Sequence, residues 1–287
     1  MTKKSKAARD SRKRSTRAAL SGATRSKKSV MDRVKAMRAA PATWDTEEGI
    51  QALLNVLRNR DEPLEVRLTA LQSLGAAAFS SAAFESCRSD YIATLRAVAE
   101  DPEPALRRRA LGVLARDKDG FAQKRLIEGL KNPEKAMVPP EKALQLLSYD
   151  IHADAYAVAR DIVRDPPNVL ARREALRLLA ADATSAPMFE KLLRDKGELR
   201  EIRQIAASAL QTLQPDKLQK HAREMLLDKS EYDDIKATSL SALTNFGDDV
   251  AIAGDKALLK SVDRLSGGKA STKYKQHARR FLGKYGR

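Results

Sequence analysis

The sequence predicts an all-α protein, a solenoid of about seven helical hairpins. Three observations support this prediction. The chain of 287 residues is 43% hydrophobic but only 5% aromatic, so its core must come from Ala, Leu, Val and Ile, of which Ala and Leu favour helices. A nine-residue amphipathic pattern recurs at steps of 31–40 residues, which is typical of a solenoid. No stretch shows the period of two that is expected of a half-buried strand.

Each copy of the pattern marks one amphipathic helix. It reads apolar, basic, two variable positions, small, usually large apolar, two variable positions, and Leu. The apolar and small positions lie on one face of a helix, because their spacing follows the helical period. The copies are 66–74, 106–114, 139–147, 171–179, 202–210, 235–243 and 274–282, and the third copy has Pro140 at the basic position.

A second apolar pattern between the copies supplies the other helix of each hairpin. We expect these helices at 50–59, 91–101, 122–132, 155–165, 188–196, 218–228 and 256–265. Turn signals rich in Asp and Pro separate the two kinds of helix, and Asp101 and Asp165 are natural N-caps there. Residues 76–87 are expected to form a loop between repeats. One such pair cannot bury its own apolar face, so neighbouring pairs stack into a continuous core.

The chain resembles a known repeat family at two of these copies. Residues 61–74 read DEPLEVRLTALQSL and residues 101–114 read DPEPALRRRALGVL, and both are similar to the HEAT repeat. The short units look most like the bacterial HEAT-like repeats that are also found in phycobilisome lyase subunits. The resemblance covers 41–287 and implies a right-handed solenoid whose second helices line the concave surface. It implies almost nothing about activity.

The net charge of +16 is concentrated at the two ends of the chain. Residues 1–40 hold 14 basic and 2 acidic residues, and residues 264–287 hold 8 basic and no acidic ones. Like charge and polarity predict a disordered tail over 1–40, with a short helix at 29–40, ahead of the repeats at 41–287. The tail is either a solubilising segment or a binding site for nucleic acid or another polyanion.

The compartment can be inferred from what the sequence lacks. The only cysteine, Cys87, excludes an intramolecular disulfide and indicates a reducing compartment. No apolar run reaches the roughly 18 residues that span a bilayer, so no membrane span is expected. The N-terminus has no apolar secretory segment; its composition leaves a transit peptide as an alternative. We expect a cytoplasmic protein, or a nuclear one in a eukaryote.

The basic position of the pattern should form a row along the solenoid. Either the row faces a groove and binds a ligand, or each side chain pairs with an acid near the start of its own or the adjacent helix. The family resemblance favours this second reading, a structural ladder. Arg108 and Arg109 have no counterpart in the other copies and are better placed than Arg107 to meet a ligand, although a solvated face is the alternative. The groove candidates are Arg67, Arg107, Arg108, Arg109, Arg172, Arg173, Arg203 and Lys236.

Nucleic-acid candidates lie at both basic ends. They are Arg12, Lys13, Arg14, Lys27, Lys28, Lys273, Lys275, Arg279 and Arg280. The last helix interleaves its basic residues with Tyr274, Phe281 and Tyr285, and such a pattern can bind single strands by stacking and charge. The alternative is a capping helix with a polar outer face. Trp44 is expected to be a core or cap residue rather than a binding anchor.

The sequence contains no catalytic constellation. The histidines His152, His221 and His277 fall in three different repeats, and none is followed by Glu. No catalytic residue, metal or cofactor is therefore expected. We expect a non-enzymatic scaffold or adaptor that binds a protein partner on its concave face. The alternative is a nucleic-acid-binding protein that uses its basic ends, and a lesser alternative is a HEAT-like lyase or enzyme subunit.

Overall fold

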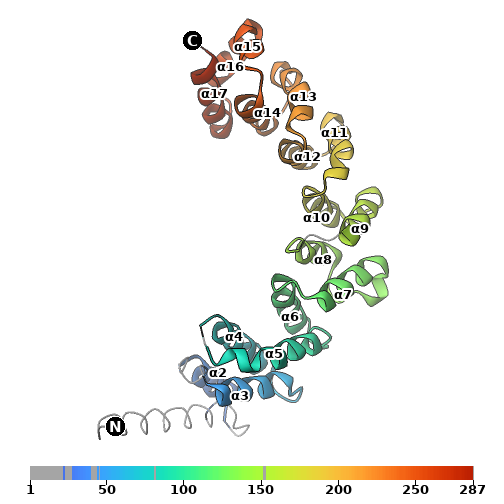
Figure 1. Ribbon diagram of the computed structural model, residues 1–287, viewed down its shortest axis with the longest axis vertical. Coiled ribbons are helices and arrows are strands. Elements are labelled where there is room, and N and C mark those ends of the chain that lie inside the picture. Colours follow the sequence, from blue (N-terminus) through green and yellow to red (C-terminus); the bar gives the residue numbers. More distant parts are fainter. Residues whose placement is uncertain are drawn as a thin grey trace, which may run out of the picture. The chain divides into compact units, whose positions relative to one another are not determined.

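The computed structural model describes residues 22, 28–39, 44, 46–80, 82–150 and 153–286. Across these residues all regular structure is helical, and hairpins follow one another in chain order (Figure 1). The prediction of an all-α solenoid is therefore confirmed. The chain divides into two compact units, Met1–Pro139 and Pro140–Arg287.

The first unit contains two rows of helices. One row comprises α2, α4 and α6, in which neighbours pack against each other, and α3 and α5 pack together in the other row. Each hairpin joins the rows, since α3 packs on α4 and α5 on α6. The bounds are α2 Val30–Ala39, α3 Glu47–Arg58, α4 Leu64–Ser80, α5 Phe84–Val98, α6 Pro104–Arg116 and α7 Gly120–Lys131, with a 3₁₀ turn at Pro133–Lys135.

The second unit repeats this arrangement. Its second helices α8, α10, α12, α14 and α17 pack in series, and α9, α11, α13 and α16 each pack on the second helix that follows. The bounds are α8 Pro140–Leu147, α9 Ala153–Arg164, α10 Val169–Leu179, α11 Ala186–Arg194, α12 Arg200–Leu213, α13 Pro215–Leu227, α14 Asp233–Phe246, α15 Asp249–Gly254, α16 Lys256–Ser266 and α17 Thr272–Tyr285, with a 3₁₀ turn at Ala183–Ser185.

The small residue of the repeated pattern lies where the helices approach each other. At this position every copy of the pattern is buried: Ala70, Ala110, Ala143, Ala175, Ala206, Ser239 and Ala278. A larger side chain there would force the packed helices apart, since interiors of this density tolerate little extra volume. The pattern thus encodes helix packing as well as helix formation.

Two local expectations were wrong. The expected loop at 76–87 is mostly helix, because α4 continues to Ser80 and α5 begins at Phe84. Alanine-rich sequence favours helix, and Phe84 is buried with its ring edge-to-face against Tyr91, 5.0 Å between centroids. The N-cap of α6 is Glu103 rather than Asp101, and that of α10 is Asn168 rather than Asp165.

Candidate ligand-binding surface

The basic position of the pattern is a structural clamp in the two repeats where it is most buried. Arg67 Nε donates to the carbonyl of Leu57, and Arg203 Nε donates to the carbonyl of Leu193, at 3.1 and 2.9 Å. Both carbonyls lie at the end of the first helix of the same hairpin. The rest of each guanidinium meets a carboxylate: Arg67 Nη2 lies 2.5 Å from Asp101, and Arg203 Nη2 lies 2.6 Å from Glu231.

Each clamp reaches forward to the next repeat. The acid that pairs with Arg67 or Arg203 lies in the turn before the following second helix, not in the turn before its own. Arg172 follows the same rule, with Nη2 at 2.6 Å from Glu198 Oε2. The hydrogen bond from Arg172 lowers the pKa of Glu198 against the opposing effect of burial. Arg67 and Arg203 therefore each fasten three elements, namely their own helix, its hairpin partner and the next turn, whereas the printed bonds of Arg172 join only its own helix to the next turn.

Helix α2 carries an additional member of this ladder that the sequence reading missed. Arg33 is buried and donates through Nη1 and Nη2 to Glu62, at 2.5 and 2.7 Å. The sequence does contain the repeat spacing in α2. The basic, small and apolar positions of the pattern are occupied there by Arg33, Ala36 and Met37. Helix α2 was assigned to a tail because of the charge around it.

The remaining basic positions lack a carboxylate in the described part of the chain. Arg107 Nε donates to Met137 O at 3.1 Å, and Nη1 donates to the carbonyls of Asp101 and Pro102 at 2.8 and 2.7 Å. Lys236 is buried without an ion pair among the described residues, since the turn before α17 contains no acid. Lys275 is half-buried. All the arginines of the row are thus held by protein groups.

Arg108 and Arg109 differ from the row. Both are exposed on α6, and within the described residues neither side chain has an ion pair or hydrogen bond. Arg173, which holds the repeat position of Arg108 in the second unit, has Nη1 3.0 Å from Glu201 Oε1. The nearby Arg177 pairs with Glu174 at 2.5 Å. The half-buried Arg173 and the exposed Arg177 of α10 are therefore neutralised, whereas Arg108 and Arg109 of α6 are not.

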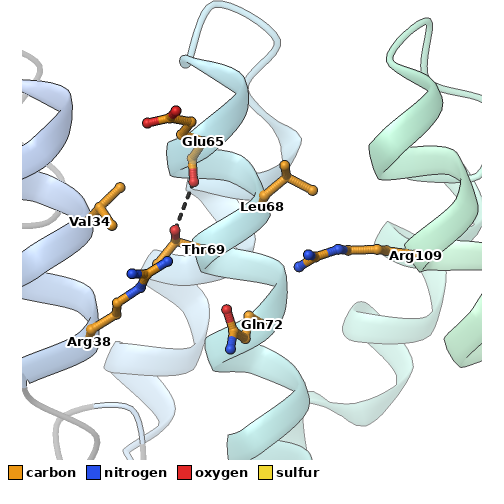
Figure 2. Close-up of a pocket in the computed structure, with 7 residues that line it drawn as sticks. All are labelled: Val34, Arg38, Glu65, Leu68, Thr69, Gln72 and Arg109. Atoms are coloured by element: carbon orange, nitrogen blue, oxygen red, sulfur yellow. Dashed lines mark hydrogen bonds between the residues drawn. The ribbon is translucent and has the colours of Figure 1, made fainter.

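A pocket of about 320 Å³ lies on the face formed by α2, α4 and α6. Figure 2 shows that Arg38 extends from α2 and Arg109 from α6, and that both guanidinium groups point toward α4. The lining residues are Val34, Arg38, Glu65, Leu68, Thr69, Gln72 and Arg109. Thr69 does not offer its hydroxyl hydrogen to a ligand, because Oγ1 donates to Glu65 O at 2.8 Å.

The charges of this pocket are unbalanced. Two exposed arginines face one exposed glutamate, and the side chains of Arg38, Arg109 and Gln72 form no hydrogen bond or ion pair within the described ranges. In Figure 2, Glu65 lies near the top, above the guanidinium groups of Arg38 and Arg109. Val34 and Leu68 add apolar surface to the same lining. The arrangement suits an anionic group that is attached to something apolar.

A second pocket, in the second unit, has no such imbalance. Its volume is about 330 Å³, and its lining includes Arg203, Glu231, Lys196 and Asp228. These four form two ion pairs, Arg203 with Glu231 and Lys196 with Asp228. Its charged groups mainly hold the repeats together, so the pocket of the first unit is the better binding candidate.

The nucleic-acid candidates are placed only in part. Arg12, Lys13, Arg14 and Lys27 lie outside the described residues, while Lys28, Lys273, Arg279 and Arg280 are exposed. On α17 the rings of Tyr274, Phe281 and Tyr285 are buried in the terminal core and so cannot stack on bases. Tyr285 Oη donates to Leu243 O at 3.1 Å, and Lys284 pairs with Asp249 at 2.9 Å. These contacts are those of a capping helix.

The histidines in the described residues do not form a metal site. His221 Nε2 lies 2.8 Å from Glu190 Oε1, while burial, Lys273 and Arg280 lower the pKa of His277. His152 lies outside the described residues. No group of three or more potential metal ligands occurs in the described part of the chain. Trp44 is buried, and its Nε1 donates to Met37 O at 2.8 Å, so it fastens the end of α2.

No described helix combines the length and the apolar character that a membrane crossing requires. No family model and no curated protein matches the sequence. Solved structures do resemble the fold. The E. coli protein YibA has a TM-score of 0.54 and 14% identity, with 94% of each chain covered.

Two further structures are more distant. The complex of CpcE and CpcF of phycocyanin lyase from Nostoc sp. PCC7120 has a TM-score of 0.41 and 16% identity, covering 93% of this chain and 94% of that one. Human deoxyhypusine hydroxylase has a TM-score of 0.36 and 15% identity, covering 86% of this chain and 99% of that one.

These comparisons correct the expectation that the chain is not an enzyme. A phycocyanin lyase complex and a deoxyhypusine hydroxylase are among the solved structures that match the chain, and the expectation is withdrawn. The lack of a recognisable catalytic motif was too weak a basis for that exclusion, because function depends on the site and not on the fold. At the level of the fold, the chain is an all-α helical-repeat solenoid that is similar to YibA.

Proposed function

We propose that this protein is a HEAT-like adaptor that binds a protein partner on the face formed by α2, α4 and α6. One observation supports this most directly. The arginines at the basic positions of the repeats are held by protein groups, whereas Arg38 and Arg109 line the pocket of this face without a described partner. Arg108, next to Arg109 in the sequence of α6, is exposed and has no described partner either. The repeat type we propose, from residues 61–74 and 101–114, is the short bacterial HEAT-like one.

A protein partner fits this face better than a nucleic acid does. The pocket lining contains Val34 and Leu68 but no aromatic ring on which a base could stack. It also contains Glu65, which would repel a neighbouring phosphate of a regularly charged strand. Protein interfaces, in contrast, commonly combine arginine with apolar surface.

The proposal can be tested by charge reversal. The tagged full-length chain is expressed in its own cells and crosslinked, and the bound proteins are identified for three forms: wild type, the double variant Arg108→Glu with Arg109→Glu, and the control Lys124→Glu. Lys124 is exposed on α7, outside the α2, α4 and α6 row. We expect a protein that wild type and control retain and the double variant loses.

Two outcomes would contradict the proposal. One is the same set of bound proteins from all three forms. The other is a bound fraction that nuclease treatment removes, since this would identify nucleic acid as the direct ligand.

A further inference from the structure

We infer that the pocket between α2 and α6 binds an acidic side chain of an extended peptide segment, with an aliphatic neighbour beside it. Arg38 and Arg109 would clamp the carboxylate, while Val34 and Leu68 would receive the aliphatic residue. This inference rests on the proposed function and names the chemistry that the partner must present. It assigns the binding to one pocket rather than to the whole face.

The two arginines extend from helices that buried ion pairs hold in place. Arg33 of α2 pairs with Glu62, just before α4, and Arg67 of α4 pairs with Asp101, just before α6. The side chains of Arg33, Arg67 and Asp101 are at most 4% exposed. Helices α2, α4 and α6 are therefore fastened in sequence, so the spacing of the two helices that carry Arg38 and Arg109 is set before a ligand arrives.

The chemistry of the lining selects a carboxylate on a peptide. A guanidinium binds a carboxylate through two parallel hydrogen bonds, and charge-assisted bonds of this kind are the stronger ones. The Gln72 side chain, which is exposed beside Arg109, can donate to a peptide carbonyl (Figure 2). The volume of about 320 Å³ accommodates one or two side chains rather than a folded surface.

Glu65 makes the pocket selective. Its carboxylate lies in the same lining as the two arginines and disfavours a second negative charge close by. At the same time it can accept a hydrogen bond from a peptide N–H group. The preferred segment therefore has an isolated Asp or Glu next to Leu, Ile, Val or Met, not a run of acids or phosphates.

The test uses random peptides displayed on phage and selected on purified full-length protein. Three forms are compared: wild type, the double variant Arg38→Gln with Arg109→Gln, and the control Lys124→Gln. All three substituted residues are exposed, and circular dichroism verifies that each variant is folded. We expect wild type and control to enrich peptides with Asp or Glu beside an aliphatic residue, and the double variant to lose this enrichment.

Affinities of the best enriched peptide are then measured by fluorescence anisotropy. Either single substitution, Arg38→Gln or Arg109→Gln, should weaken binding about tenfold, because each removes a charge-assisted hydrogen bond to the carboxylate. Glu65→Gln should strengthen the binding of a peptide that carries a second acid, because it removes the repelling carboxylate from the lining. A peptide with Gln or Asn in place of its acid is the matched ligand control.

The inference is overturned if selection on wild type shows no acidic preference, if the double variant enriches the same peptides, or if a single-stranded RNA competes as well as the peptide. These outcomes are separable from failure of the adaptor proposal. Suppose that a partner protein is lost in the Arg108→Glu and Arg109→Glu variant but that no acidic peptide is selected on wild type. The adaptor proposal then stands, and only the peptide site at Arg38 and Arg109 is rejected.

Discussion

Breaking one clamp of the ladder should destabilise the repeats on both sides of it. We consider the substitution Glu231→Ala. The side chains of Arg203 and Glu231 are 4% and 2% exposed, and two hydrogen bonds of 2.9 and 2.6 Å join them. Glu231 also accepts from the backbone N–H of Tyr232 at 2.9 Å. The substitution therefore leaves a buried guanidinium with only Leu193 O as its partner.

The expected cost is about 3–5 kcal/mol, the usual result of removing one partner from a buried pair. In an array of repeats the loss should appear first in neighbouring elements, because each repeat contacts mainly its neighbours. Amide hydrogen exchange followed by mass spectrometry measures this directly. We expect exchange in α12 and α14 to accelerate by roughly two to four orders of magnitude, with smaller effects in the first unit.

Two further variants give the control and the refutation. Arg164→Ala removes an exposed pair, with side chains 78% and 70% exposed, and should cost about 0–1 kcal/mol. The double variant Arg203→Met with Glu231→Leu should recover most of the stability, since no buried charge remains. If Glu231→Ala costs no more than Arg164→Ala, the ladder does not hold the repeats together as described.

Three other predictions concern stability. Burial is the largest single influence on the pKa of Asp101 and would raise it, but the hydrogen bonds from Arg67 and from the Glu103 N–H, together with the charges of Arg67 and Arg60, hold that pKa below its usual value; this group therefore adds stability above pH about 4 that is lost as the pH falls through its folded pKa. In urea unfolding at a series of pH values, Asp101→Asn should be less stable than wild type at neutral pH and should lose less stability on acidification; an unchanged acid dependence would exclude this role. Trp44→Ala should cost about 3–5 kcal/mol and increase exchange in α2, because it deletes a buried ring and its bond to Met37; unchanged exchange in α2 would exclude it. Lys236→Met should leave the melting temperature equal or raise it, since it removes a buried charge that has no carboxylate in the described structure; a clear fall in melting temperature by scanning calorimetry would show that the ammonium group has a stabilising partner.

The sequence predicted the helices well because their signal is local. Each copy of the pattern fixes an amphipathic face within nine residues, and Ala70 or Ala206 is buried as its position requires. The loop expected at 76–87 was wrong because alanine favours helix when no breaker intervenes, and Phe84 provides a buried anchor for the next helix.

The ladder was predicted only in outline. Asp101 was expected both as a cap and as an acid of the ladder, for its own or the adjacent helix, and it pairs with Arg67 of the preceding repeat. Sequence spacing does not reveal which of two neighbouring repeats an acid will face, because that depends on how hairpins stack. Glu231, which completes the clamp of Arg203, was not singled out at all.

The pocket could not be derived from the sequence. Arg109 was a candidate because it departs from the pattern, but Arg38 lay in a segment interpreted as the end of a tail. The two come together only because α2 packs beside α4 as a further second helix. A search for the repeat spacing that had included Arg33 would have placed α2 in the row and Arg38 on its exposed side.

The forward direction of the clamps also bears on how the chain matures during synthesis. Arg67 emerges from the ribosome 34 residues before its carboxylate, and Arg203 emerges 28 residues before its own. Until the following turn has been translated, each newest hairpin holds a guanidinium whose Nη groups lack their carboxylate, although its Nε can already donate to the carbonyl of its own hairpin. Assembly should therefore lag translation by one hairpin, and nascent chains stalled after Arg203 but before Glu231 should be the ones that proteases cut.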